Sequence, residues 1–125
     1  GVAEKVTAQI MAHLHRERYL DAARFCRFYV RDKYRFNQWG RMKIAQMLRM
    51  KGLSDGDIQS GLEEIDTEEY DGILKKLLKQ KMKSIKAAND YERSMKLIRF
   101  AMGRGFTLEE IRRYVNQLDP DEDFD

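Results

Sequence analysis

An internal repeat constrains the fold of this chain more than any other feature of its sequence. Shifting the chain against itself by 53 residues aligns apolar residues with apolar residues, glycine with glycine, and polar helix caps with each other. The aligned pairs include Ile44 with Leu97, Gly52 with Gly105, Ser54 with Thr107, Ile58 with Ile111 and Leu62 with Val115. Further upstream, an offset of 49 aligns Phe25, Phe28 and Tyr29 with Leu74, Leu77 and Leu78. Such repetition predicts a tandem array whose units bury apolar faces against their neighbours.

Each copy of the repeat has the pattern of α-helices. Apolar residues recur at steps of three and four, and the chain has a single proline among many leucines, methionines, lysines, arginines and glutamates, which favour helix. Helices should begin after Ser54, Asn89 and Thr107, because each is a polar cap with an acidic residue three positions later. Gly52 and Gly105 should end the preceding helices, since glycine adopts the left-handed conformation at little cost.

We therefore predict an all-α protein of tandem three-helix repeats that form an elongated, curved array. The expected helices span about residues 6–18, 21–35, 40–51, 55–65, 68–86, 91–103 and 108–118. Residues 1–18 are interpreted as the last helix of a truncated first repeat, and 19–66 and 67–119 as the second and third repeats, followed by an acidic tail at 120–125. On this interpretation the first two helices of the first repeat are absent.

Charge follows the same period, although the net formal charge is only +3. Residues 16–51 carry a net +8, residues 52–71 a net −8, and residues 75–104 again a net +8. The first two helices of each unit are therefore basic, and the third is acidic.

The basic charges form two predicted stripes. One side of an ideal helical projection carries four arginines, Arg24, Arg27, Arg31 and Arg35. The opposite, apolar side is expected to carry Ala22, Phe25, Tyr29 and Phe36. In the next unit a similar stripe consists of Lys75, Lys76, Lys79, Lys83 and Lys86. Two such stripes could follow a polyanion, and the planar arginine fork suits phosphate or carboxylate. A solvated face paired with the acidic helices explains the pattern equally well.

Trp39 lies between two predicted helices, close in sequence to Arg41 and Lys43. Its indole could stack on a base or contact a protein partner, but a tryptophan packed at the corner of a repeat is the preferred interpretation. We include Trp39, Arg41 and Lys43 with the four arginines and with Lys75, Lys79 and Lys83 as candidate contacts for a partner or for DNA.

No pattern indicates catalysis, a cofactor or a metal. His13 and His15 are two residues apart on a helix and so point to different faces, and the single cysteine, Cys26, is interpreted as a buried structural thiol. The chain has no glycine-rich phosphate loop, no signal peptide and no apolar run near the roughly 20 residues that a membrane span needs. We expect a cytoplasmic, monomeric, non-enzymatic protein without cofactors.

Three motifs resemble those of the RecX family of bacterial regulatory proteins, and the resemblance covers about residues 6–118. The first, Y-L-D-A-A-R-F at 19–25 with F-Y-V at 28–30, is similar to the family's Y-L-D-D-x-R-F-A motif and the aromatic and valine that follow it. The second is W-G-R-M-K-I at 39–44 with Leu48 and K-G-L at 51–53. The third is R-G-F-T at 104–107 with I-R-R at 111–113. Ala22 and Arg41 depart from the pattern, where many members have an acidic residue and proline.

The resemblance implies a modulator of the RecA recombinase that lodges in the groove of the RecA–DNA filament. Such proteins limit filament extension and lower ATP hydrolysis, strand exchange and co-protease activity, and some contact single- or double-stranded DNA weakly. The residues alone leave two alternatives open, namely a free-standing nucleic-acid-binding module and a plain scaffold repeat. The modest net charge and the acidic helices argue against tight binding to bare DNA.

Overall fold

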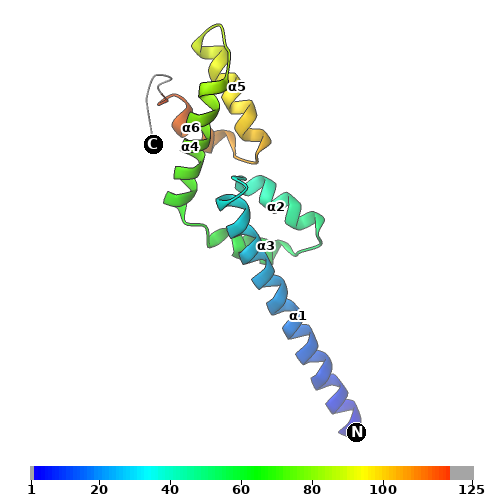
Figure 1. Ribbon diagram of the computed structural model, residues 1–125. Coiled ribbons are helices and arrows are strands. Elements are labelled where there is room, and N and C mark those ends of the chain that lie inside the picture. Colours follow the sequence, from blue (N-terminus) through cyan, green and yellow to red (C-terminus); the bar gives the residue numbers. More distant parts are fainter. Residues whose placement is uncertain (1, 119–125) are drawn as a thin grey trace.

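The computed structural model describes residues 2–118, apart from the side chains of residues 12, 14, 15 and 17–19. Six helices and no strand occur within this range, which confirms the all-α prediction. The helices are α1 (Val2–Arg35), α2 (Arg41–Met50), α3 (Asp55–Glu63), α4 (Thr67–Ser84), α5 (Asp90–Gly103) and α6 (Leu108–Val115) (Figure 1). The predicted acidic tail at 120–125 lies outside the described residues, as does the side chain of His15.

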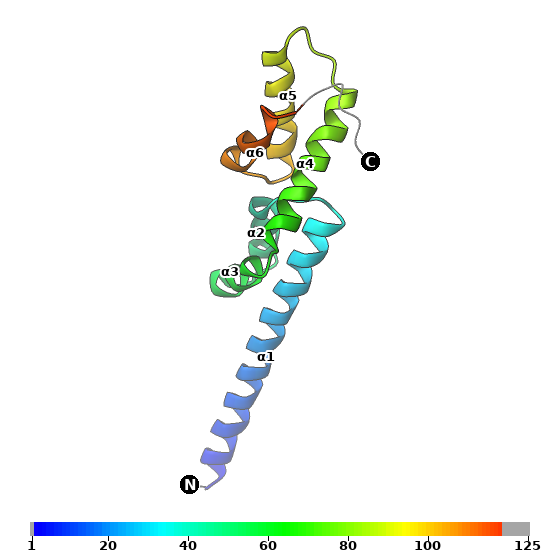
Figure 2. The same cartoon turned by 90° about the vertical axis from the view of Figure 1, so that its left-hand side faces the viewer.

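The helices form two successive groups of three. The second half of α1 packs with α2 and α3, and α4 packs with α5 and α6. The start of α4 lies beside the end of α1, and both helices run in the same general direction, so the molecule is elongated (Figures 1 and 2). This arrangement confirms the prediction of tandem three-helix units.

The first helix differs from the prediction. α1 is continuous over 34 residues, so the expected break between residues 18 and 21 is wrong. The sequence around that point contains neither glycine nor proline and is rich in arginine, glutamate, leucine and alanine, which propagate a helix. Asp21 lies within the helix, 3.7 Å from Arg24 in an ion pair between exposed side chains. The first part of α1 projects away from the other helices (Figure 2).

The predicted starts of α3, α5 and α6 are confirmed by their caps, whereas α3, α4 and α6 end two to three residues earlier than expected. The side chains of Ser54, Asn89 and Thr107 each accept a hydrogen bond from the backbone N–H three residues later. At Thr107 the capping is reciprocal, because the backbone N–H of Thr107 also donates a hydrogen bond to the carboxylate of Glu110. Gly52 and Gly105 have φ values of 89° and 98°, as expected for glycines that end helices.

A single apolar core runs through both groups of helices. Its central link is a row of three aromatic rings, with centroids 6.2 Å apart between Tyr34 and Tyr70 and 5.3 Å apart between Tyr70 and Phe106. These rings come from α1, from α4 and from the turn between α5 and α6. Cys26 is fully buried, as predicted, and burial, followed by the nearby charge of Asp57, raises the pKa of its thiol.

The apolar side predicted for α1 is wrong at its phenylalanines, whereas Tyr29 packs against the core as expected. Phe25, Phe28 and Phe36 are exposed, with 45%, 57% and 79% of their surfaces accessible. The buried row of this helix consists of Cys26, Val30 and Tyr34, and its counterpart in α4 is Leu74, Leu78 and Met82. The two helices therefore correspond at an offset of 48 rather than 49. The aromatic residues misled the prediction because their spacing also fits a helical face.

Candidate partner-binding surface

The arginines of α1 border the core rather than lie opposite to it. Arg27, Arg31 and Arg35 each follow a buried residue by one position, which places them about 100° around the helix from the core row. At the corrected offset of 48, these three residues correspond to Lys75, Lys79 and Lys83 of α4. The two stripes therefore occupy equivalent positions on equivalent helices, as expected for a repeated contact surface. We call these residues, with Arg24, the basic face.

Intramolecular ion pairs engage part of the basic face. Arg27 Nε lies 3.7 Å from Glu64 Oε1, just after α3, and Arg35 Nε lies 2.6 Å from Glu69 Oε1 in the first turn of α4. Arg31 is exposed on the same side of α1. These two ion pairs connect α1 to the acidic segment that contains Glu64 and Glu69. Part of the basic face is therefore used within the molecule, and part of it is exposed.

The carboxylate of Glu69 is the best-defined acceptor on this side of the molecule. Hydrogen bonds from Arg35 and then from Tyr34 hold the pKa of Glu69 below its ordinary value. Burial, followed by the hydrogen bond to Glu69, raises the pKa of Tyr34. The end of α1 is therefore fixed to the beginning of α4 by a group that stays ionised in mildly acidic solution.

The lysines of the basic face lie along α4, in the second group of helices. Lys75 Nζ lies 4.8 Å from the centre of the Tyr114 ring of α6. Lys75 and Lys79 border a shallow hollow with Tyr114 and Leu118, and Lys83 is exposed one turn further along α4. The lysine part of the basic face is thus positioned by packing between α4 and α6.

Arg41 does not belong to an open binding face. Its Nη1 donates a 2.8 Å hydrogen bond to Glu110 Oε2 of α6, and its guanidinium lies 4.1 Å from the centre of the Tyr70 ring. The backbone N–H of Arg41 donates to the Tyr70 hydroxyl at 3.0 Å. Glu110 also completes the cap of α6 at Thr107, so this carboxylate joins the two groups of helices. Sequence reasoning could not find this pair, because its partners are 69 residues apart.

Trp39 and Lys43 lie at the same junction. Trp39 is half-buried and packs against the core, and its ring lies 5.0 Å from Lys33 Nζ and 4.6 Å from Lys43 Nζ. The structure therefore brings Trp39, Arg41 and Lys43 together between α1, α2 and the turn after α5. The packed-corner interpretation of the tryptophan agrees with this position.

A direct backbone contact forms the centre of the junction. The N–H of Gly40 donates to the carbonyl of Arg104 at 2.8 Å, and the N–H of Met42 donates to the carbonyl of Gly105 at 3.1 Å. The guanidinium of Arg104 donates in return to the carbonyls of Asn37 and Gln38. A Cβ atom on Gly40 would lie 2.3 Å from the Gly105 carbonyl carbon. Only glycine fits at this point, a constraint that the sequence did not reveal at Gly40.

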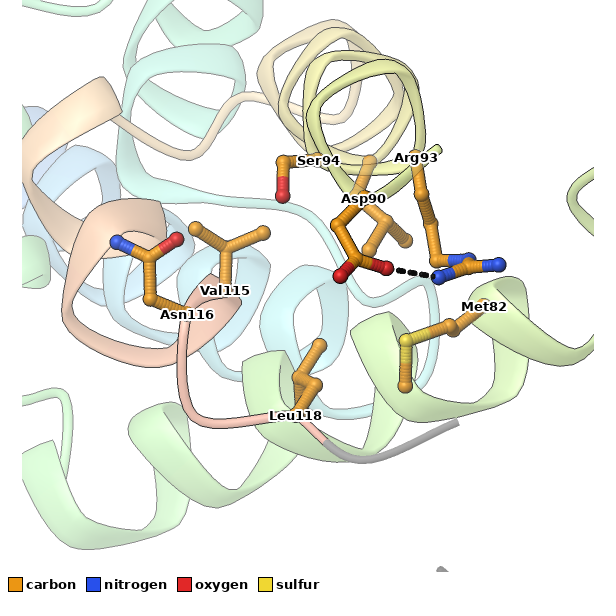
Figure 3. Close-up of a pocket in the computed structure, with 8 residues that line it drawn as sticks. Met82, Asp90, Arg93, Ser94, Val115, Asn116 and Leu118 are labelled. Atoms are coloured by element: carbon orange, nitrogen blue, oxygen red, sulfur yellow. Dashed lines mark hydrogen bonds and ion pairs between the residues drawn. The ribbon is translucent and has the colours of Figure 1, made fainter. Parts of the chain in front are cut away.

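A hollow between α4, α5 and the end of α6 offers no evident chemistry (Figure 3). Its apolar lining includes Met82 and Val115, and its charged pair, Asp90 and Arg93, is joined at 2.7 Å. The described lining contains neither histidine nor cysteine. Among the side chains that the structure describes, no three potential ligands come together in a group suited to a metal ion. No described helix is long and apolar enough to cross a membrane.

Fold and surface together define an all-α protein of tandem three-helix units with a repeated basic face. Within that class the chain belongs to the RecX family: the model of the second three-helix domain of RecX matches residues 21–62, and that of the third matches residues 68–115.

Curated relatives support this assignment. The regulatory protein RecX of Oceanobacillus iheyensis is 29% identical over 99% of this chain and 46% of its own length. That of Clostridium tetani is 29% identical over 94% of this chain and 55% of its own length, and that of Enterococcus faecalis is 31% identical over 88% and 41%. The chain thus spans about half the length of these relatives. No solved structure matches the chain significantly.

Proposed function

We propose that this protein is a regulator that inhibits the RecA recombinase. In this proposal it binds in the groove of the RecA–DNA filament and limits filament extension, ATP hydrolysis and strand exchange. The observation that carries the proposal is the match, in order, to two successive RecX domains over most of the chain. The name of these relatives, regulatory protein RecX, agrees with a regulatory rather than a catalytic role. The proposed partner implies a cytoplasmic location.

The shape of the molecule supports binding to a repeating polymer. Two units of three helices follow one another along an elongated body (Figure 1). The sequence places basic residues at equivalent positions of the first helix of each unit. Linked units that contact successive subunits of a filament increase the total affinity, because the second contact is intramolecular. An array of repeats therefore suits a filament better than a single globular partner.

We assign the contact with acidic filament surfaces or exposed phosphates to the basic face. Its members are Arg24, Arg27, Arg31, Arg35, Lys75, Lys79 and Lys83. Arg24 and Arg31 are the best residues for a test, because both are exposed and, within the described structure, neither forms an ion pair within 4.0 Å with another helix. Arg41 is left out, since its guanidinium pairs with Glu110 within the molecule. Trp39 and Lys43 are left out as well, because the indole packs against the core and the Lys43 ammonium lies over its ring.

The experiment is a titration of a RecA filament on single-stranded DNA, with ATP hydrolysis as the readout. The parent chain should inhibit hydrolysis, and the double variant Arg24→Glu, Arg31→Glu should require at least about tenfold more protein for the same inhibition, equivalent to about 1.4 kcal/mol. The matched control is Arg99→Glu, Arg112→Glu, which makes the same charge change at two exposed arginines of α5 and α6. Absence of inhibition by the parent chain at any ratio would refute the proposal for this chain.

Binding to bare DNA, measured across a range of salt concentrations, distinguishes the nucleic-acid alternative. If phosphates dominate binding, the logarithm of affinity should fall with the logarithm of salt by roughly 0.7 to 0.9 per phosphate contact. Tight DNA binding with that slope, combined with unchanged ATP hydrolysis by the recombinase, would favour a free-standing DNA-binding module instead.

A further inference from the structure

A groove between α2 and the end of α5 lies away from the basic face, and Lys43 is the one candidate contact residue in its described lining. Its walls carry three methionines, Met42 and Met47 from α2 and Met102 from α5, and buried Phe106 contributes to its lining. We call it the methionine groove. It crosses the junction between the two groups of helices, so an occupant would contact both.

The methionines on its rim do not serve the core. Met42 is 60% exposed and Met102 is 51% exposed, whereas the methionine that fills the core, Met82, is only 6% exposed. Large apolar side chains gathered at a concave site indicate an interaction surface, and methionine adapts its flexible thioether to partners of different shape. The groove is therefore suited to apolar side chains of a partner.

Positive charge adjoins one end of the groove. Lys43 lines the groove, and the ammonium groups of Lys43 and Lys33 both lie over the ring of Trp39. In the described part of the chain, no carboxylate oxygen lies within 4.0 Å of either ammonium group. Arg49, at the same groove, forms a 3.2 Å ion pair with Asp55 in which both side chains are mostly exposed. The excess charge around the apolar lining is thus positive and selects negatively charged groups.

These features favour a protein segment over a nucleic acid. A single strand is normally held by aromatic rings open for base stacking and by a row of cations along the backbone. Here the nearby indole of Trp39 already has two ammonium groups over its ring, and the groove itself presents thioethers. Apolar contacts beside a few carboxylates match this surface better than stacked bases do.

We propose that the methionine groove binds a segment of a partner protein in which apolar side chains stand next to aspartate or glutamate. This inference goes beyond the proposed function, because it concerns a different surface from the basic face and does not depend on the identity of the partner. Binding across α2 and α5 would also stiffen the junction that the groove spans.

The first test selects peptides on the full chain from a displayed library of random sequences. Enriched peptides should combine apolar and acidic residues. Their affinity should fall at least about tenfold for Met42→Glu, Met102→Glu, a change at two exposed positions that leaves the core intact. The matched control is Met50→Glu, on the same helix as Met42 and 74% exposed but outside the groove lining, which should bind like the parent.

Methyl NMR spectra of the seven methionines then locate the bound peptide. The signals of Met42, Met47 and Met102 should shift, and that of buried Met82 should not. Failure to enrich any peptide, enrichment of basic peptides, or equal loss of binding in the Met50→Glu control would overturn the proposal. So would shifts of the same three methyl signals caused by an oligo-dT strand or by raising the protein concentration alone, which would identify a nucleic acid or a second copy as the occupant.

Discussion

Arg41 and Arg49 lie on the same helix and both pair with a carboxylate, yet their surroundings differ. The Arg41 side chain is 34% exposed and that of its partner Glu110 only 9%, whereas Arg49 and Asp55 are mostly in solvent. Exposed pairs contribute little to stability, while a hydrogen bond to a desolvated charge contributes more.

We expect Arg41→Met to lower the free energy of unfolding by about 2 kcal/mol. The variant leaves the buried Glu110 carboxylate without its guanidinium and removes the contact with Tyr70. The matched change Arg49→Met should cost less than about 0.5 kcal/mol. Urea unfolding of the two variants measures both values, and equal losses would contradict a structural role for the Arg41–Glu110 pair.

Glu69 should make stability depend on pH. Hydrogen bonds from Arg35 and Tyr34 lower its pKa in the folded protein, so its contribution is present above the unfolded pKa of about 4.3 and is lost as pH falls through the lower, folded value. The free energy of unfolding should therefore decrease below about pH 5. Urea unfolding between neutral and acidic pH should show a shallower decrease for Glu69→Gln than for the parent. Glu63→Gln, a change at an exposed carboxylate, is the control that should keep the parent slope.

At the scale of single residues, the sequence predicted the features that depend on residues nearby in the chain. The caps at Ser54, Asn89 and Thr107 and the burial of Cys26 follow from local patterns. The role of Arg41 could not be predicted, because a basic residue next to a tryptophan looks the same whether its partner is a ligand or a distant part of the chain.

Among the helices, α1 is unusual because its two halves have different environments. Its described residues between Val2 and Met11 are exposed, whereas Cys26, Val30 and Tyr34 are buried. An isolated helix as short as residues 2–11 has only marginal stability in water when no other part of the protein packs against it.

We expect amide hydrogen exchange in this chain to divide α1 at about its middle. Amides near residues 4–11 should exchange almost as fast as in an unfolded peptide, because opening there exposes no buried surface. Amides near residues 26–35 should exchange only with unfolding of the core, at rates like those in α4. Mass spectrometry of deuterium uptake measures this, and uniform protection along α1 would show that the first half is stabilised in another way.

The helix register illustrates what periodicity can and cannot determine. The repeat correctly predicted the presence of α2 to α6, because caps mark the starts of α3, α5 and α6 and glycines follow α2 and α5. It failed for α1, where no breaker marks a boundary and where two rows, one aromatic and one containing Cys26, both have helical spacing. Only packing against α3 and α4 decides which row is buried.

In the whole molecule, the two groups of helices are joined by a contact that tolerates no side chain. We expect Gly40→Ala to lower the free energy of unfolding by about 1–3 kcal/mol, because the added Cβ would overlap the backbone of Gly105. Gly72→Ala, which adds a methyl group to α4 in open space, should instead stabilise the protein by up to about 1 kcal/mol.

The same variant tests whether the groups unfold together. In the parent, the shared core and junction should give one calorimetric transition whose van't Hoff and calorimetric enthalpies agree. Gly40→Ala should separate it into two transitions, since repeat units remain coupled only through their interface. Two transitions already present in the parent would show that the junction does not couple the groups.

The tandem arrangement of three-helix units was predictable from the repeat, but the junction was not. The sequence shows Gly40 as one small residue beside a tryptophan, and its constraint arises from Gly105, 65 positions away. Likewise, the basic face was found as a pattern of charge, while its ion pairs depend on how α1 meets α4.

The contact between Gly40 and Gly105 determines at which end of the array a designed unit could be added. Gly52 is the counterpart of Gly105 and has the same left-handed backbone with open space around it, so an engineered unit could be fused ahead of α1–α3 and dock its own glycine there. At the far end, the counterpart of Gly40 is Arg93, inside α5. A designed unit could not attach there by the same contact without remodelling the start of that helix. Designed units that use this contact could therefore be added ahead of α1–α3 but not after α6.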